Sequence, residues 1–122
     1  MLSEADQIWN RATALSSGDA ARIGDVALAD LLLFHGRAMN GGLDHAIDTL
    51  SSEELAASAQ GYSYFGLLEV AAVLRRTILE PEVISQLEVE YDRAVPNDNA
   101  LFLAFEAKLL SSPDDFCPLL AA

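Results

Sequence analysis

The sequence predicts an all-α fold, a compact bundle of about six to seven helices around a central apolar helix. Apolar residues recur at spacings of three and four along most of the chain, as they do on helix faces. Alternating runs of β-branched residues, which indicate strands, are missing. Of the 122 residues, 52% are hydrophobic, which is too many for a disordered chain. We therefore expect a single helical domain over residues 1–122.

The first two helices can be placed from their starts. The hydroxyl of Ser3 can cap a first helix that turns Ile8 toward the core. Asp19 can cap a second helix that runs to about Met39. Between residues 26 and 34 the second helix is apolar on all sides except at Asp30, which is the pattern of a helix surrounded by others. We expect it to be the central helix.

A structural turn is predicted at Asn40-Gly41-Gly42, where two glycines supply the positive φ angles that let a helix end and the chain reverse. A short helix can follow over residues 43–50. The next helix begins with a capping box, in which the Ser51 hydroxyl and the Glu54 carboxylate each satisfy a free backbone amide. Gly61 is predicted to end that helix.

Three further helices are expected in the second half of the chain. An amphipathic helix is predicted over Tyr64–Ile78, and Pro81 suits the first turn of the helix that follows it. Pro96-Asn97-Asp98 breaks the chain again. The last helix, Asn99–Leu110, carries apolar residues around most of its circumference, which indicates that it is either buried or partly devoted to another subunit. On the amphipathic helix the expected core stripe consists of Tyr64, Leu67, Leu68, Ala71, Leu74 and Ile78.

The charge of the chain favours a cationic partner. Nineteen Asp and Glu stand against seven Lys and Arg, which gives a formal net charge of −12. Such a protein is repelled by nucleic acid and by anionic membrane surfaces, so we expect neither direct nucleic-acid binding nor membrane binding. The start of the chain lacks the basic and apolar segments of a signal peptide, and no apolar run approaches about 18 residues. We therefore expect a cytoplasmic protein.

The carboxylates concentrate in two stretches that we predict to bind a basic partner protein. Residues 38–74 contain no Lys or Arg, and residues 80–98 contain only Arg93. If the two stretches share a face, they form a negative patch. The alternative is a solvated surface that only keeps the protein soluble. The predicted partner-binding residues are Asp44, Asp48, Glu53, Glu54, Glu80, Glu82, Glu88, Glu90 and Asp92.

Five motifs follow one another in a characteristic order over roughly residues 20–116. They are Asn40-Gly41-Gly42-Leu43, Ser51-Ser52-Glu53-Glu54-Leu55, Leu67-Leu68-Glu69-Val70-Ala71, Leu87-Glu88-Val89-Glu90-Tyr91 and Asp114-Asp115-Phe116. In this order the chain resembles the DNA mimic protein 19 family, an all-helical bacterial group. The resemblance implies a helical fold, is consistent with a homodimer, and implies an acidic surface that occupies the site of a DNA-binding protein.

Catalytic and metal motifs are not recognisable in the sequence. Residues 61–66 lack the second glycine of a hydrolase Gly-x-Ser-x-Gly turn. His35 and His45 are not at a metal-ligand spacing, and the single Cys117 cannot form an internal disulfide. Asp30, within an apolar helix, must find solvent, a hydrogen-bond donor or an arginine from another helix. We predict no catalytic residue, no cofactor and no metal, and hence no enzyme.

Two alternatives to the DNA mimic stay open. The first is an immunity-type factor that neutralises a basic nuclease toxin, which would use the same acidic surface. The second is an enzyme whose site is assembled from scattered residues such as Asp30, His35 and His45. A polar pocket around these residues would favour the enzyme, whereas a convex surface of carboxylates would favour binding.

Overall fold

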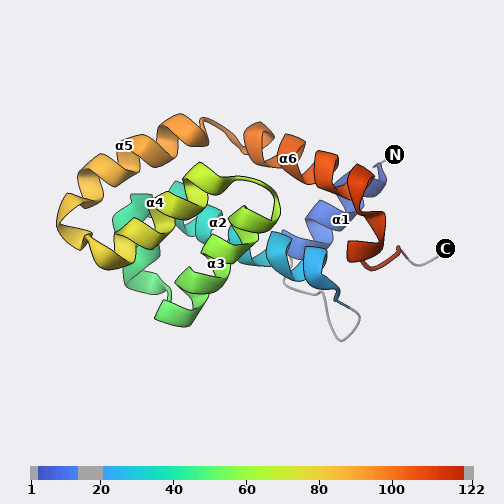
Figure 1. Ribbon diagram of the computed structural model, residues 1–122, viewed down its shortest axis with the longest axis horizontal. Coiled ribbons are helices and arrows are strands. Elements are labelled where there is room, and N and C mark those ends of the chain that lie inside the picture. The colour runs from blue at the N-terminus through green and yellow to red at the C-terminus, as the bar shows by residue number, and fades with distance from the viewer. Residues whose placement is uncertain (1–2, 14–20, 120–122) are drawn as a thin grey trace.

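The computed structural model describes residues 3–13 and 21–119, and within them the chain is all-α. Six α-helices pack together, as Figure 1 shows, and no strand occurs in the described ranges. The predicted fold class is therefore confirmed. The helices are α1 (Glu4–Thr13), α2 (Ile23–Thr49), α3 (Ser52–Tyr64), α4 (Leu68–Leu79), α5 (Ile84–Ala94) and α6 (Asp98–Ser111), with single 3-10 turns at η2 (Pro81–Val83) and η3 (Pro113–Asp115).

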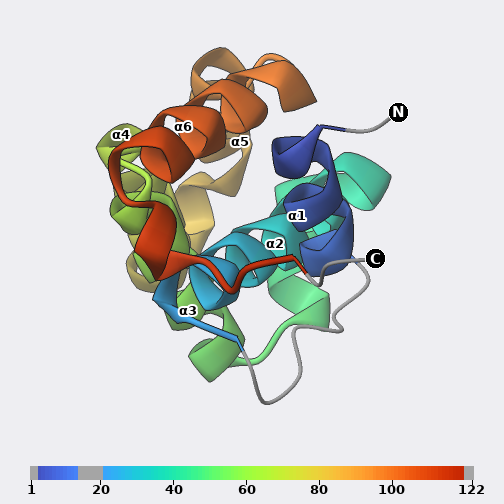
Figure 2. The same ribbon diagram turned by 90° about the vertical axis from the view of Figure 1, so that its right-hand side faces the viewer.

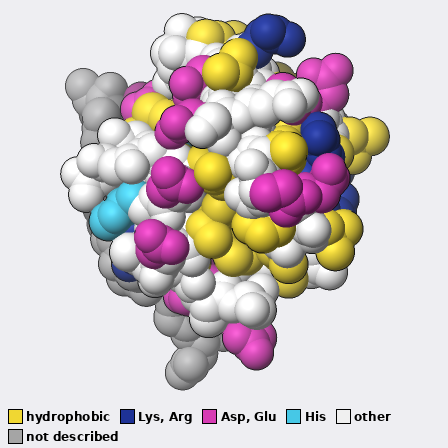
Figure 3. Space-filling view, turned by 90° about the vertical axis from the view of Figure 1, so that its left-hand side faces the viewer, with side chains coloured by type: hydrophobic (Ala, Val, Ile, Leu, Met, Phe, Trp, Pro, Cys, Tyr) yellow, Lys and Arg dark blue, Asp and Glu magenta, His cyan; other side chains and the backbone are white. Residues whose placement is uncertain are grey.

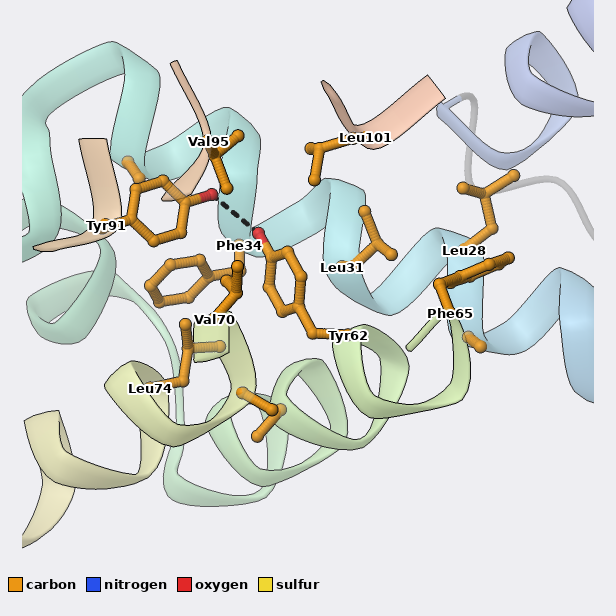
Figure 4. Packing of buried hydrophobic residues seen from close by; sticks show 14 of the residues in the cluster. Leu28, Leu31, Phe34, Tyr62, Phe65, Val70, Leu74, Tyr91, Val95 and Leu101 are labelled. Carbon is orange, nitrogen blue, oxygen red and sulfur yellow. Dashed lines mark hydrogen bonds between the residues drawn. The ribbon is translucent and has the colours of Figure 1, made fainter. Parts of the chain in front are cut away.

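The central apolar helix is α2, as predicted. It passes through the middle of the molecule in Figures 1 and 2 and packs against α1, α3 and α5. Leu28, Leu31 and Phe34 are almost completely buried on it. The ring of Phe34 lies 6.2 Å from the ring of Tyr62 on α3 and 5.7 Å from the ring of Tyr91 on α5. Figure 4 shows these three rings together, so the core joins α2, α3 and α5.

The predicted capping boxes are present. At α1 the amide of Asp6 donates to the Ser3 hydroxyl, and the amide of Ser3 donates to the Asp6 carboxylate. At α3 the amide of Glu54 donates to the Ser51 hydroxyl at 3.1 Å, and the amide of Ser51 donates to the Glu54 carboxylate at 2.8 Å. Each box satisfies backbone amides that a helix start leaves free.

The start of α2 differs from the prediction, whereas the break in its middle agrees with it. The predicted cap Asp19 lies outside the described residues, and Arg22 precedes the first residue of the helix. At Gly42 the backbone leaves the helical conformation, with φ 84° and ψ 178°, so α2 consists of two helical segments joined by a kink. Gly42 has the positive φ expected of the glycine pair, whereas Gly41 does not. The two segments correspond to the helix predicted to reach about Met39 and the short helix predicted over residues 43–50.

The predicted end of α3 at Gly61 is wrong. Gly61 is buried inside the helix, where a Cβ atom would lie 2.5 Å from the carbonyl oxygen of Ala27 on α2. The glycine permits a close approach of two helices, and the helix continues to Tyr64. The chain turns instead at Gly66, whose φ is 78°. Tyr64 therefore ends α3 and does not begin the amphipathic helix.

The faces of α4 and α6 also differ from the expected ones. On α4, Leu68 and Ile78 are 66% and 46% exposed, although they were predicted to face the core. The buried face consists of Val70, Ala71, Val73, Leu74 and Thr77. On α6 only Leu101 and Phe105 are buried, and Leu110 is 85% exposed. This helix therefore lies on the surface, and the alternative that it is buried is wrong.

None of the helices in the described ranges has the length and apolar character that a membrane-spanning segment requires.

Candidate functional site: acidic surface

Four of the nine predicted partner-binding carboxylates bind groups within the protein. Glu54 accepts the amide of Ser51 in the capping box. Glu80 and Glu90 both pair with Arg76, at 3.1 Å and 3.2 Å. The side chain of Glu88 accepts the backbone amide of Leu43 at 3.0 Å. These four carboxylates therefore stabilise the fold and are not wholly available to a partner.

The bond of Glu88 is a helix cap supplied from another helix. The kink at Gly42 interrupts the helical hydrogen bonds, so Leu43 begins a new helical segment with a free amide. The carboxylate of Glu88 on α5 binds that amide, and it lies at the positive end of the new segment, where a negative charge is favourable. The bond also joins the two acidic stretches, because α5 lies beside the kinked end of α2. The predicted turn thus positions this cap.

The other five predicted carboxylates are exposed, and in the described part of the chain they make no hydrogen bond or ion pair. They come from the kinked end of α2, the first turn of α3, the 3-10 turn η2 and the end of α5. They are Asp44, Asp48, Glu53, Glu82 and Asp92.

Asp48 and Asp92 occupy positions that are unfavourable in the isolated protein. Asp48 lies in the last turn of α2 and Asp92 in the last turn of α5, where the partial negative charge of the helix end repels a carboxylate. Such a position costs about 0.3–1 kcal/mol. The last turn of α2 has no basic residue to offset the cost, and Asp44 stands one turn earlier with the same charge. An external cation would relieve both repulsions.

The acidic face is mixed. Figure 3 views the end of the molecule formed by α5 and the kinked end of α2, at the left of Figure 1. Asp and Glu side chains are spread over this face, and hydrophobic side chains lie between them. Two apolar residues of α4 contribute to the exposed surface, Ile78 at 46% and Leu79 at 77%. A partner would therefore meet separated carboxylates together with apolar area.

A buried chain of hydrogen bonds runs beneath this surface, and no motif in the sequence predicts it. His35 is 5% exposed; its Nδ1 lies 2.8 Å from the Tyr91 hydroxyl and its Nε2 lies 2.7 Å from a carboxylate oxygen of Asp98. The Tyr91 hydroxyl lies 2.7 Å from the Tyr62 hydroxyl, the bond dashed in Figure 4. Burial raises the pKa of both phenols, so both hydroxyls keep their protons.

The donor and acceptor roles along these hydrogen bonds follow from the carboxylate of Asp98 at one end. A carboxylate can only accept, so Nε2 of His35 carries the proton that Asp98 binds. In the neutral imidazole Nδ1 then accepts from the Tyr91 hydroxyl, which in turn accepts from Tyr62. Both ring nitrogens are occupied, so His35 holds the packing of three helices together and has no nitrogen free for proton transfer or a metal.

The three residues of the scattered-residue enzyme do not share a pocket. His35 lines a pocket beside α1, whereas Asp30 lines a different one between α2 and α3. His45 packs against Gly41 after the kink and lines neither. Burial raises the pKa of Asp30, which has no cationic partner among the described residues. Residues 3–13 and 21–119 also contain no group of three or more His, Cys, Asp or Glu placed to hold a metal ion.

The arginine partner that sequence reasoning sought for Asp30 belongs to Asp25. Asp25 is 2% exposed, and its carboxylate accepts from Arg11 on α1 at 2.6 Å. The other carboxylate oxygen accepts the amides of Cys117 at 2.7 Å and Arg22 at 3.0 Å. One side chain thus fastens the C-terminal segment to α1 and α2. The sequence offered no signal for this, because Asp25 looks like an ordinary acidic residue in a first helical turn.

Comparisons of the chain with protein-family models, with curated proteins and with solved structures found no match. The resemblance to the DNA mimic protein 19 family therefore stays a prediction.

Proposed function

We propose that this protein is an acidic interaction domain that occupies the cationic site of a basic, DNA-binding protein. The proposal rests chiefly on Asp48 and Asp92, two exposed carboxylates at helix ends where the isolated protein gains nothing from a negative charge. A guanidinium or ammonium group of a partner would pair with each of them. The resemblance described above and the net charge of −12 favour the same class of partner.

The bond between Glu88 and Leu43 supports the proposal in a second way. It holds the middle of α5 against the kinked end of α2, so the bond links the segment that carries Asp44 to the helix that carries Asp92. A preorganised set of charges loses less entropy on binding than charges on mobile segments. The hydrophobic side chains between the carboxylates would add apolar contacts, as in the centre of protein interfaces.

The test is a competition experiment with matched variants. The protein is immobilised, exposed to lysate of its source cells, and eluted with duplex DNA at constant ionic strength. We expect DNA to release a basic protein, because the two ligands compete for one cationic site. The released protein is then identified, which separates a transcription regulator from a nuclease toxin.

The decisive variant is Asp48→Asn with Asp92→Asn, which removes two charges while keeping side-chain size. Its control is Glu4→Gln with Asp114→Asn, which removes two exposed charges from α1 and η3, at the opposite end of the molecule in Figure 1. We expect the first double variant to lose most of the captured protein and the control to retain it. Equal capture by both variants, or a captured protein that DNA does not release, would refute the proposal.

A further inference from the structure

A second candidate binding site is a pocket that shares no residue with the predicted acidic surface. It lies between α1, α2 and the first residue of α6, and its volume is 580 Å³. Figure 2 shows α1 and α6 on either side of α2. Pockets that bind small molecules have volumes of about 300–1,000 Å³. Size therefore allows a small ligand of more than a few atoms.

The walls of the pocket are apolar and held in place. Trp9 of α1 and Leu32 and Leu33 of α2 line it, and all three residues are only half-buried. The indole of Trp9 packs edge-on against Phe102 at 5.2 Å and lies 5.9 Å from the ring of Phe105. These contacts fix the indole plane, so the apolar wall exists before any ligand arrives.

Gly36, an exposed residue of α2, lines the pocket without a side chain to fill it. A Cβ atom there would meet nothing within 4 Å. Every other glycine in the described residues has either a positive φ or a neighbour that a Cβ would meet at less than 3 Å. A glycine within a helix costs about 1 kcal/mol relative to alanine, and neither crowding nor backbone conformation requires one at this position. Its effect is to keep this space free of side-chain atoms.

Two opposite charges stand at the rim. The carboxylate of Asp98 is held by His35 at 2.7 Å, yet its side chain remains 77% exposed. The guanidinium of Arg37 makes a single long hydrogen bond, 3.4 Å to the carbonyl oxygen of Thr49, so most of its five N–H groups are free. The rim is neutral in sum, unlike the protein as a whole, which repels anions.

We propose that this pocket binds a small zwitterion with an apolar body, that is, an apolar α-amino acid or a molecule of the same chemistry. The apolar body lies over Gly36 between Trp9 and Leu33. The ammonium group pairs with Asp98 and the carboxylate with Arg37. Burying the apolar part supplies most of the affinity, and the two charges select a zwitterion over a simple acid or amine.

The test uses L-phenylalanine as the probe. Trp9 is the only tryptophan of the chain, so its fluorescence, excited where phenylalanine does not absorb, reports the pocket directly. The matched probes are hydrocinnamate, which lacks the ammonium group, and phenethylamine, which lacks the carboxylate. We expect L-phenylalanine to shift the emission with saturation and to bind more tightly than either matched probe.

Three variants locate the site. Gly36→Leu places an apolar side chain in the pocket, its Cβ free of any neighbour within 4 Å, and should weaken binding at least about tenfold, with thermal stability equal or higher. Asp98→Asn keeps an acceptor for His35, and it should weaken binding about two- to fivefold, as should Arg37→Gln. Asp114→Asn and Arg93→Gln, outside the pocket, are the controls and should change nothing.

Several outcomes would overturn the proposal. One is an emission of Trp9 that stays unchanged up to about 10 mM L-phenylalanine, where even a Kd of about 1 mM would saturate the site. Another is normal binding by a folded Gly36→Leu protein, which would place the ligand elsewhere. If phenethylamine or hydrocinnamate binds as tightly as the amino acid, the zwitterion assignment is wrong.

Discussion

Replacing Asp25 by alanine should detach the C-terminal segment and destabilise the whole protein. The carboxylate holds three donors, the Arg11 guanidinium at 2.6 Å and the amides of Cys117 and Arg22 at 2.7 and 3.0 Å. Removing one member of a buried ion pair costs about 3–5 kcal/mol, because the remaining charge loses its counter-ion. Arg11 would keep one hydrogen bond, to the carbonyl oxygen of Cys117 at 2.9 Å. Since the Arg11 side chain is 21% exposed and can regain some water, we expect the lower end, about 3 kcal/mol.

Two assays separate the local effect from the global one. Urea denaturation followed by circular dichroism gives the free energy of unfolding, and a loss of about 3 kcal/mol corresponds to a Tm lower by roughly 10 °C. Alkylation of Cys117, the only cysteine, reports release of the C-terminal segment. In the variant we expect alkylation to be faster under conditions where the helices stay folded, since Cys117 has lost the acceptor for its amide.

Asp30→Ala is the matched control, because Asp30 lies on the same helix and has no cationic partner in the described ranges. It removes the same carboxylate without breaking a bond, so it should leave the free energy of unfolding unchanged or raise it. The reasoning would be refuted if Asp25→Ala lost less than about 1 kcal/mol, or if both variants gave the same alkylation rate.

Three further predictions concern the core. Gly61→Ala should destabilise the protein by about 1–3 kcal/mol in urea denaturation, because its Cβ would collide with a backbone oxygen of α2. Gly36→Ala, where a Cβ has open space around it, should instead stabilise the protein by up to about 1 kcal/mol. Tyr91→Phe should cost about 1–3 kcal/mol and more than Tyr62→Phe, because the Tyr91 hydroxyl has two partners and the Tyr62 hydroxyl has one. Equal losses would contradict the position of Tyr91 in the middle of the hydrogen-bond chain. Burial raises the pKa of the Tyr62 and Tyr91 phenols, so the folded protein keeps protons that the unfolded chain releases above about pH 10. Their contribution to the free energy of unfolding should be complete below that pH and fall as pH rises beyond it. Tyrosinate absorbance measured along an alkaline titration checks this, and the two phenols should ionise only as the helical circular dichroism is lost.

The fold class and the starts of α1 and α3 could be predicted because their causes are local in sequence. Each capping box joins residues three apart, and the serine and the acidic residue are visible together. The end of α3 could not be predicted in this way. Gly61 looks like a helix terminator until Ala27, far away in sequence, is seen to lie against it. Tertiary contact overrode a local preference there.

The candidate site shows the same division. The acidic stretches could be located from the sequence. Glu88 and Glu90 were predicted to be available to a partner, because the groups that bind them are far away in sequence. Glu88 binds an amide 45 positions away, and Glu90 pairs with an arginine 14 positions away. Charge counting gives the sign of a surface, whereas packing decides which charges remain available to a partner. For the same reason, the pocket over Gly36 has no sequence signature.

The wide spacing of the unpaired carboxylates has a consequence for competition with DNA. Duplex DNA carries one charge per about 1.7 Å of its axis and holds condensed counterions, whose release makes protein binding steeply dependent on salt. Carboxylates one helical turn apart, such as Asp44 and Asp48, are separated by about 5–6 Å. Such a surface condenses few counterions and has few to release. A partner that binds both ligands should lose affinity for DNA faster than for this protein as ionic strength rises, so salt itself would shift the competition toward the protein.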